Sequence, residues 1–204
     1  MQFIVLCSSN GTTFQAVIDA MKAGNLTAKC LGLITDKPNR GCLEKARSAG
    51  LSVRIAVKNL GESIDAYDAR LVSAAHELEN RVKADPSDTV IAAMGWMKLL
   101  SPTFLSAYPN RVLNVHPSLL PKYGGKGMYH MHVHEAVMKN AEKESGITIH
   151  VMEERYDEGK ILLQKSFAIS DADTPLSIKD HAQALEKEWY PKVLEMIERG
   201  EIRL

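Results

Sequence analysis

The sequence has neither an excess of one charge nor a long run of apolar residues. Its 204 residues include 25 Lys and Arg against 25 Asp and Glu, so the formal net charge is zero. Nucleic acids and anionic membranes select a basic surface, and a membrane helix needs roughly 18 consecutive apolar residues. The N-terminus lacks the basic segment of a signal peptide. We therefore expect a soluble cytoplasmic protein that acts on small molecules, as a monomer or homodimer, without a nucleic-acid or membrane partner.

Cysteine is scarce, and the familiar motifs built from cysteine or glycine are missing. Cys7, Cys30 and Cys42 form no CxxC pair and no zinc-ligand spacing, so we expect buried thiols in a reducing compartment. There is also no complete GxGxxG and no GKS or GKT sequence, which argues against dinucleotide binding and against a P-loop.

What the sequence does contain is an alternation of short apolar runs and amphipathic stretches. These predict strands at 3–7, 31–35, 53–57, 90–94, 112–115, 146–152 and 160–166, and helices at 13–22, 43–49, 64–82 and 174–199. Such an alternation gives right-handed crossovers and a Rossmann-like, doubly wound α/β sheet that is mostly parallel. The last two strands follow each other without a helix, so we expect an antiparallel C-terminal strand pair. No linker or repeat divides the chain, which predicts a single domain.

Polar segments fall where predicted strands end, at the edge where open α/β sheets bind ligands. The first, SSNGTT at residues 8–13, combines small residues with a helix N-terminus, which suits an anion such as phosphate. An ordinary turn with a threonine cap has the same pattern. The second contains Asn114 and His116. Residues two apart in a strand face the same side, so an amide donor for an oxyanion and an imidazole that moves a proton can converge on one point.

The third segment is Asp157-Glu158-Gly159, which precedes the last strand. An acidic residue near a glycine is also typical of an ordinary turn, and His116 could equally be a structural histidine bonded to the backbone. If Asp157 approaches His116, it raises the pKa of the imidazole and favours the charged form. The three segments together indicate a catalytic site.

Taken in order, the segments SSNGTTFQAVIDA, GWMKLLSP, LNVHPSLLPKY and YDEG resemble the folate-dependent formyltransferases, and among them the branch that acts on glycinamide ribonucleotide in purine biosynthesis. The resemblance covers essentially the whole chain. It implies the formyltransferase fold and transfer of the formyl group of 10-formyltetrahydrofolate, as cosubstrate, to the amine of glycinamide ribonucleotide, without a metal. Residues 1–204 then form one formyltransferase domain, with a lobe of about 1–100 for phosphate and substrate and a lobe of about 101–204 for folate and catalysis.

The resemblance also assigns roles to individual residues. Asn114 and His116 match the catalytic Asn and His, and Asp157 matches the Asp that keeps the histidine charged. The implied reaction is direct attack of the amine on the formyl carbon, through a tetrahedral intermediate that Asn114 and His116 stabilise. The residues implied for the substrate are Gly11, Thr12, Thr13, Gln183 and Glu186. Those implied for folate are Met97, Lys98, Leu99, Leu100, Asn114, Glu154 and Tyr156.

The sequence departs from the family pattern in several places. The phosphate loop of the family usually reads SGNGSN, whereas here Ser9 replaces Gly and Thr13 replaces Asn. Ile64 stands where many members carry an Arg for the glutamate tail of folate, so recognition of the tail must differ. The segment 124–134 is several residues longer than usual and rich in glycine. We expect a mobile flap that becomes ordered over the bound ligands; a static surface insertion is the alternative.

Histidines in and near this segment allow more than one interpretation. His130, His132 and His134 form HxHxH, which can bind a metal if the segment is extended, whereas a helix from about residue 132 would point them in different directions. The resemblance instead places His132 and His134 in a loop that lines the site. His150 matches a position beside the active site, although a core histidine has the same pattern.

Three other functions fit parts of these motifs. Methionyl-tRNA formyltransferase shares the HPSLLP-like signature but carries a further C-terminal domain and a basic surface. Formyltetrahydrofolate deformylase has an extra N-terminal domain. A catalytically silent binding module could retain the phosphate loop, but the joint presence of Asn114, His116 and Asp157 argues against it.

Overall fold

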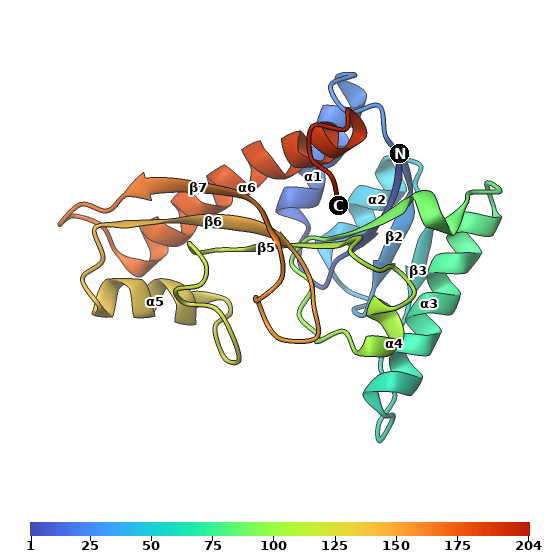
Figure 1. Cartoon of the computed structure of the whole chain (residues 1–204), viewed down its shortest axis with the longest axis horizontal. Helices are drawn as coiled ribbons and strands as arrows, with labels where there is room; N and C mark the ends of the chain where they lie inside the picture. Colours follow the sequence, from blue (N-terminus) through green and yellow to red (C-terminus); the bar gives the residue numbers. More distant parts are fainter.

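A computed structural model describes all residues from 1 to 204, and it is built around one seven-stranded sheet (Figure 1). The strands are β1 (Gln2–Leu6), β2 (Lys29–Thr35), β3 (Val53–Ile55), β4 (Thr89–Ala93), β5 (Val112–His116), β6 (Glu144–Val151) and β7 (Ile161–Ala168). The helices are α1 (Thr12–Lys22), α2 (Gly41–Ser48), α3 (Ile64–Asn80), α4 (Pro102–Leu105), α5 (Met131–Lys139) and α6 (Pro175–Glu198), with a 3₁₀ turn, η1, at Pro86–Asp88.

The sheet has the order β3-β2-β1-β4-β5-β6-β7. Strands β1 to β5 are parallel, and β6 pairs antiparallel with both β5 and β7. This confirms the predicted doubly wound sheet with an antiparallel C-terminal pair. The chain reverses its direction of winding between β1 and β4, which is where such sheets bind ligands. Sequence patterns missed α4, because a four-residue helix is too short to show a period.

The last helix, α6, begins and ends where the sequence predicts. Thr174 caps it, since its hydroxyl accepts the N–H of Ser177 while the Ser177 hydroxyl accepts the N–H of Thr174, which satisfies two otherwise unpaired donors. Gly200 follows the helix with φ of 73°, a conformation that glycine adopts without strain. The helix is therefore held at both ends while it crosses the sheet.

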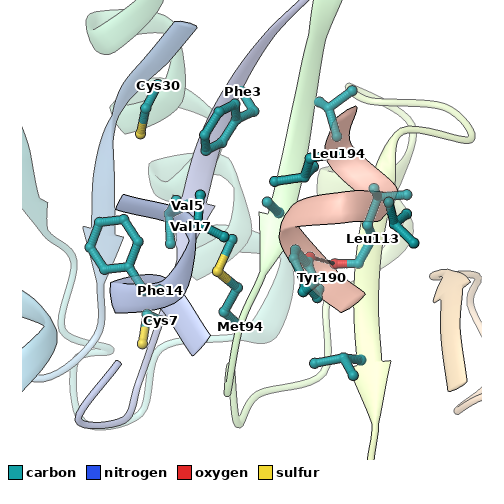
Figure 2. Packing of buried hydrophobic residues seen from close by; sticks show 14 of the residues in the cluster. Phe3, Val5, Cys7, Phe14, Val17, Cys30, Met94, Leu113, Tyr190 and Leu194 are labelled. Carbon is teal, nitrogen blue, oxygen red and sulfur yellow. Dashed lines mark hydrogen bonds between the residues drawn. The ribbon is translucent and has the colours of Figure 1, made fainter. Parts of the chain in front are cut away.

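Two hydrophobic cores lie on opposite faces of the sheet. One packs α1, α2 and α6 against the strands (Figure 2), and the other packs α3 and α4 against the reverse face. Tyr190 of α6 is fully buried in the first core, and its hydroxyl contacts the carbonyl oxygens of Ala93 at 3.1 Å and Leu113 at 3.3 Å. This side chain joins α6 to two central strands, β4 and β5.

None of the helices combines the length and the apolar composition needed to cross a lipid bilayer.

Candidate active site

The loop after β1 presents a helix N-terminus at the carboxyl edge of the sheet. Gly11 takes φ of 71° and α1 begins at Thr12, with no side chain bonded to its first N–H groups. The first N–H groups of a helix have no partner within the helix, and with the helix dipole they attract an anion. Gly11 also has no room for a side chain, because a Cβ there would lie 2.9 Å from Cβ of Cys42. The loop has the features of an anion-binding turn.

This loop is bonded directly to the segment that follows β4. The Ser8 N–H donates to the Gly95 carbonyl at 3.1 Å, and the Met97 N–H donates to the Ser8 hydroxyl at 3.3 Å. Ser9 adds a further contact, since its hydroxyl accepts the N–H of Gly11 at 3.2 Å. The two segments that the resemblance assigns to different substrates therefore lie side by side.

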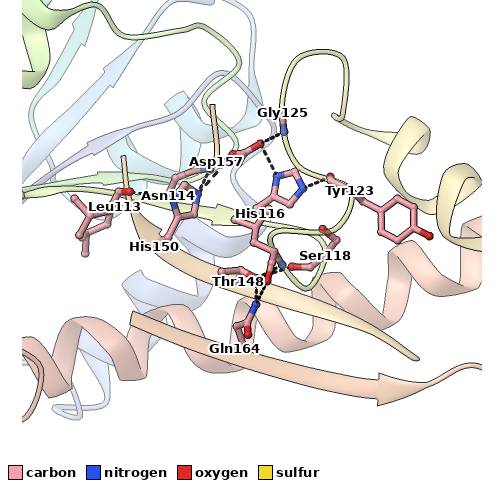
Figure 3. Close-up of polar contacts among 12 residues, drawn as sticks. Leu113, Asn114, His116, Ser118, Tyr123, Gly125, Thr148, His150, Asp157 and Gln164 are labelled. Atoms are coloured by element: carbon pink, nitrogen blue, oxygen red, sulfur yellow. Dashed lines mark hydrogen bonds and ion pairs between the residues drawn. The ribbon is translucent and has the colours of Figure 1, made fainter. Parts of the chain in front are cut away.

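Asn114 and His116 lie on the same side of β5, as their spacing predicts, and β6 supplies a partner for each. In the antiparallel register Asn114 is opposite His150, and His116 is opposite Thr148 (Figure 3). Directly opposed residues of neighbouring strands share a face of the sheet. Four polar side chains thus meet on one face near the end of β5.

Asp157 comes from the loop between β6 and β7 and joins this group. One carboxylate oxygen lies 3.5 Å from Nδ1 of His116, and the other lies 3.6 Å from Nε2 of His150. The carboxylate also accepts the N–H of Gly125 at 2.9 Å. The expected approach of Asp157 to His116 is therefore observed, and Asp157 contacts a second histidine and the glycine-rich segment 124–134 as well.

Two opposing effects act on the pKa of His116. Burial lowers the pKa of His116 below its ordinary value, and the neighbouring Asp157 and the carbonyl of Tyr123 raise it only partly back. The side chain of His116 is 5% exposed, so loss of hydration outweighs one carboxylate at 3.5 Å. The carboxylate of Asp157 therefore acts on the pKa of His116 in the expected direction, and its role in keeping the histidine charged during the reaction stays a prediction.

His150 fixes the orientation of the Asn114 amide. Nδ1 of His150 lies 3.0 Å from the carbonyl of Val151, so this nitrogen carries the proton. Burial is the main cause that lowers the pKa of His150, and in the neutral ring Nε2 is then an acceptor for the Asn114 Nδ2 group at 3.3 Å. One N–H of the amide is held in this way, and the second remains free to donate to a ligand.

The backbone around His116 is held by a separate set of contacts. Nε2 of His116 lies 2.7 Å from the Tyr123 carbonyl. The Thr148 hydroxyl accepts the N–H of Leu120 and donates to the carbonyl of Ser118, and Gln164 donates to the carbonyl of Leu120. The HPSLLP segment is thereby fixed to β6 and β7 through its own main chain.

The residues predicted for the substrate meet across two helices. The hydroxyl of Thr13, on α1, donates to the Glu186 carboxylate of α6 at 3.0 Å. Burial raises the pKa of Glu186 to about 7, against the opposing effects of Thr13 and Lys187. Gln183 is half-buried one turn earlier on α6. The structure therefore brings Thr13 and Glu186 together beside the anion-binding turn, although their separation in sequence gives no hint of this.

Only some of the residues predicted for folate have accessible side chains. Met97 is exposed, Lys98 and Leu99 are half-buried, and Lys98 pairs with the buried carboxylate of Asp36 at 3.4 Å. Leu100 is 1% exposed and belongs to the core on the α3 side, so its side chain is not available at the surface. Besides Asn114, described above, the other two predicted residues, Glu154 and Tyr156, are exposed on the loop before β7.

Helix α5 separates the three clustered histidines. His130 precedes the helix with φ of 51°, and His132 is exposed with Nδ1 3.2 Å from the Gly127 carbonyl. His134 is buried, and its Nδ1 has no partner. The HxHxH pattern is therefore not an extended one, and no group of three or more His, Cys, Asp or Glu side chains is arranged to hold a metal ion. Ile64, at the start of α3, is half exposed.

The buried His134 should make the fold sensitive to acid. Its pKa is lowered to about 4 from 6.5, chiefly by burial and then by Lys179 and His116. A histidine whose pKa is lower in the folded than in the unfolded protein contributes its stability at pH values above the pKa of the unfolded state. This contribution, up to about 3 kcal/mol, is lost as the pH falls from about 6.5 to about 4. We expect His134→Leu to reduce the loss of stability between about pH 8 and pH 5, measured by urea unfolding. His132→Leu, on the exposed face of the same helix, is the control and should leave the pH dependence unchanged; equal slopes in both variants would contradict the assignment.

Three functional features escaped the sequence analysis. The Tyr123 carbonyl and the Gly125 N–H are backbone groups, which no side-chain pattern reveals. The third is Thr148, which lies two residues before His150 in β6. Antiparallel pairing of β5 with β6, had it been expected, would have indicated this residue, because the pairing places Thr148 opposite His116 just as it places His150 opposite Asn114.

Comparison with known proteins agrees with this geometry. The model of the formyl transferase family matches residues 1–194. The chain is 33% identical over 204 residues to phosphoribosylglycinamide formyltransferase of Escherichia coli (strain K12), covering all of this chain and 90% of that protein. It is 31% identical to the Bacillus subtilis (strain 168) protein of the same name, over 96% of this chain and 94% of the relative. Among solved structures, phosphoribosylglycinamide formyltransferase from Bacillus halodurans has a TM-score of 0.87 and 30% identity, covering 100% of this chain and 98% of that one.

The chain therefore belongs to the formyl transferase family, and it is a transferase enzyme. Its full-length relatives carry the name phosphoribosylglycinamide formyltransferase, so within the family it groups with these enzymes of purine biosynthesis, as the sequence motifs predict.

Proposed function

We propose that the protein transfers the formyl group of 10-formyltetrahydrofolate to the amine of glycinamide ribonucleotide. The observation that carries the proposal is the convergence of Asn114, His116 and Asp157 at the end of β5, beside the anion-binding turn on the same edge of the sheet. The names of the full-length relatives support both the reaction and the substrate. The first half of the chain then supplies the phosphate site, and the second half supplies catalysis and most of the donor site.

The substrate amine attacks the formyl carbon directly, and the electron pair of the carbonyl moves onto oxygen. The free N–H of the Asn114 amide donates to this oxygen, because His150 already holds the other one. A donor that is fixed before the reaction stabilises the developing oxyanion without reorganisation. No covalent intermediate with the enzyme is needed.

We assign His116 a proton-transfer role, because its imidazole lies beside the Asp157 carboxylate, which stabilises a positive charge on the ring. It accepts the proton that the attacking amine releases, becomes an imidazolium beside the Asp157 carboxylate, and gives the proton to the leaving nitrogen of the folate. The bond from carbon to that nitrogen breaks and the formyl carbonyl re-forms. Asp157 thus stabilises the charge as it appears on His116, and this carboxylate is the first of the groups that raise the pKa of the imidazole.

Access to His116 requires a local rearrangement. Nε2 faces the Tyr123 carbonyl at 2.7 Å and Nδ1 faces Asp157. A carbonyl only accepts, so Nε2 carries a proton in this arrangement. For Nε2 to take the proton of the amine, it has to leave the carbonyl, and the ring proton has to move to Nδ1, where Asp157 accepts it. The segment that carries the carbonyl continues through Gly125 and Gly127, both with positive φ, where the backbone is least restricted. This is the part of the site that we expect to move.

The direct test is to mix the enzyme with glycinamide ribonucleotide and 10-formyltetrahydrofolate. Absorbance follows the release of tetrahydrofolate, and mass spectrometry detects the formylated ribonucleotide. Release of tetrahydrofolate without a formylated product, at the same rate with the amine omitted, would instead identify a deformylase. No release under either condition would leave a binding protein.

Replacing Thr12 and Thr13 with valine should weaken binding of the ribonucleotide and leave the chemistry intact. The Thr12 hydroxyl is lost as a phosphate donor, and the Thr13 hydroxyl, which donates to Glu186 without ligand, can no longer turn to the phosphate. A charge-assisted contact of this kind is worth roughly 1.5–3 kcal/mol, so we expect KM to rise at least about tenfold with kcat little changed. Thr27→Val is the matched control, because Thr27 also bonds a glutamate of α6, Glu198, at 2.6 Å, but lies at the other end of the helix. A fall in kcat at unchanged KM would exclude the phosphate role.

The inserted segment should become protected when ligands bind. Lys126 is exposed between two glycines with positive φ, so trypsin should cut there quickly in the free enzyme and slowly with saturating folate and ribonucleotide. Lys83, in an exposed turn after α3, provides the internal control and should be cut at the same rate throughout. Equal rates at Lys126 with and without ligands would mean that the segment is a static insertion.

A further inference from the structure

Both ring nitrogens of His116 face acceptors in the free enzyme. Nε2 lies 2.7 Å from the Tyr123 carbonyl, and Nδ1 lies 3.5 Å from the carboxylate of Asp157. Since a carbonyl has no proton to give, Nε2 carries the proton of its contact, and the lone pair of Nδ1 is turned to the carboxylate. His116 therefore has no free nitrogen with which to take a proton until the Tyr123 carbonyl withdraws.

The carbonyl that holds Nε2 belongs to a residue in an unfavourable backbone conformation. Tyr123 has φ of 59°, in the left-handed region that residues with a Cβ rarely adopt. Two residues later the Gly125 N–H donates to Asp157 at 2.9 Å, so the chain is fixed to the site on that side. The carbonyl is thus aimed at His116 by a conformation that costs free energy and has to be stabilised by other contacts.

The stabilising contacts are made by the side chain of Tyr123, which points away from His116 toward α5 (Figure 3). Its hydroxyl accepts an N–H of the Asn140 amide at 2.9 Å and donates to the Glu142 carboxylate at 2.9 Å. Lys122 donates to the same carboxylate at 3.0 and 3.2 Å, and hydrogen bonds to charged groups are the stronger ones. We call the two hydroxyl contacts the Tyr123 clamp. Through this clamp, the connection between α5 and β6 holds the residue whose carbonyl holds His116.

We propose that Tyr123 is a positioning residue that makes the enzyme specific for the amine over water, because it withholds Nε2 of His116 until the ribonucleotide binds. The inference rests on the proposed function. If Nε2 is free while the amine is absent, it takes a proton from water and the water oxygen attacks the formyl carbon. The bond from carbon to the folate nitrogen then breaks, that nitrogen receives the proton, and formic acid and tetrahydrofolate leave. The clamp prevents this loss of the donor.

The clamp is tested first by nuclear magnetic resonance of the free enzyme, without any assay of activity. The Nε2 proton of His116, identified by its absence in His116→Gln, should exchange slowly with water because the Tyr123 carbonyl holds it. Tyr123→Phe keeps the ring and loses both clamp contacts, so its signal should be lost to exchange. Tyr108→Phe also loses a hydroxyl contact, to Glu79 at 3.3 Å, and as the control it should retain the signal. A signal that persists in Tyr123→Phe would overturn the proposal.

A second pair of variants separates the aim of the backbone from the packing of the ring. Tyr123→Ala and Tyr123→Gly lose the same side chain, but only glycine takes the left-handed conformation without strain. For a residue with a Cβ, the cost of this conformation corresponds to a factor of about five to thirty in population. We therefore expect the Nε2 proton to exchange at least about fivefold more slowly in the glycine variant than in the alanine variant. Equal exchange in the two would assign the ring to packing alone and overturn the proposal.

The functional part is scored separately, with 10-formyltetrahydrofolate and no amine. We expect Tyr123→Phe and Tyr123→Ala to release tetrahydrofolate and formic acid at least about fivefold faster than the wild type, Tyr123→Gly to fall between, and Tyr108→Phe to match the wild type. An unchanged rate in a variant that has lost the Nε2 signal would overturn the role in specificity. A wild-type enzyme that never formylates the ribonucleotide would refute the proposed function, while the clamp is still read from the resonance.

Discussion

Asp157→Asn should retain the fold and reduce kcat at least about tenfold. The amide oxygen of an asparagine can still accept the Gly125 N–H that Asp157 binds at 2.9 Å, so the loop keeps its position. What the variant loses is the negative charge 3.5 Å from Nδ1 of His116, where a positive charge appears during the proton transfer. One pKa unit corresponds to about 1.4 kcal/mol, or a factor of about ten in rate.

The pH dependence of this variant distinguishes the role of Asp157 from simple structural support. Asp157 raises the pKa of His116 against the effect of burial, so its removal should lower that pKa further. The acidic limb of the kcat profile should therefore shift to lower pH while the plateau falls. Glu158→Gln removes the neighbouring carboxylate, which pairs with Arg155 at the surface, and should change neither. Near-normal turnover of Asp157→Asn from about pH 6 to pH 9 would refute the assignment.

Asn114→Ala should have the larger effect, a loss of roughly 10²–10³ in kcat, because removal of one donor to an oxyanion typically costs this much. The substrate affinities should change little, since the interaction is strongest in the tetrahedral intermediate. The free amide N–H has no substitute nearby: His150 Nε2, its neighbour at 3.3 Å, is an acceptor in the neutral ring.

Two measurements show whether a loss of kcat comes from the missing donor or from damage to the fold. The unfolding midpoint of Asn114→Ala should remain close to that of the wild type, which shows that β5 is intact, and Asn80→Ala, at the exposed end of α3, should be fully active. A loss of kcat smaller than about fivefold would mean that another group stabilises the oxyanion.

Much of the fold can be predicted from the sequence because both faces of its parallel strands are covered. Such strands appear as unbroken apolar runs, and β1, β2, β4 and β5 all begin and end within two residues of the predicted limits. The helical spacing of apolar residues and the capping residues Thr174 and Gly200 likewise predict α6, from Thr174 to Arg199. The patterns fail where an element is too short for a period, as in α4, or where a segment is mainly glycine and polar residues, as before α5.

Part of the candidate site can likewise be predicted from the sequence, and part of it cannot. Asn114 and His116 can be paired from the strand period alone, whereas the contacts of Asp157 to His150 and to the Gly125 N–H depend on how distant loops return to the sheet. The direction in which the pKa of His116 is shifted could not be predicted either. It depends on the balance between one carboxylate and the loss of hydration, and the sequence indicates the carboxylate but not the depth of burial.

The register between β5 and β6 limits where the chain can gain or lose residues. Asn114 is opposite His150, and His116 is opposite Thr148. The addition or removal of one residue within β6 would turn both partners to the other face of the sheet at once. No single substitution could restore them, so variation in the length of β6 should be selected against. The connection from residue 124 to residue 130 only has to return the chain to α5 and β6, so changes in its length should be tolerated.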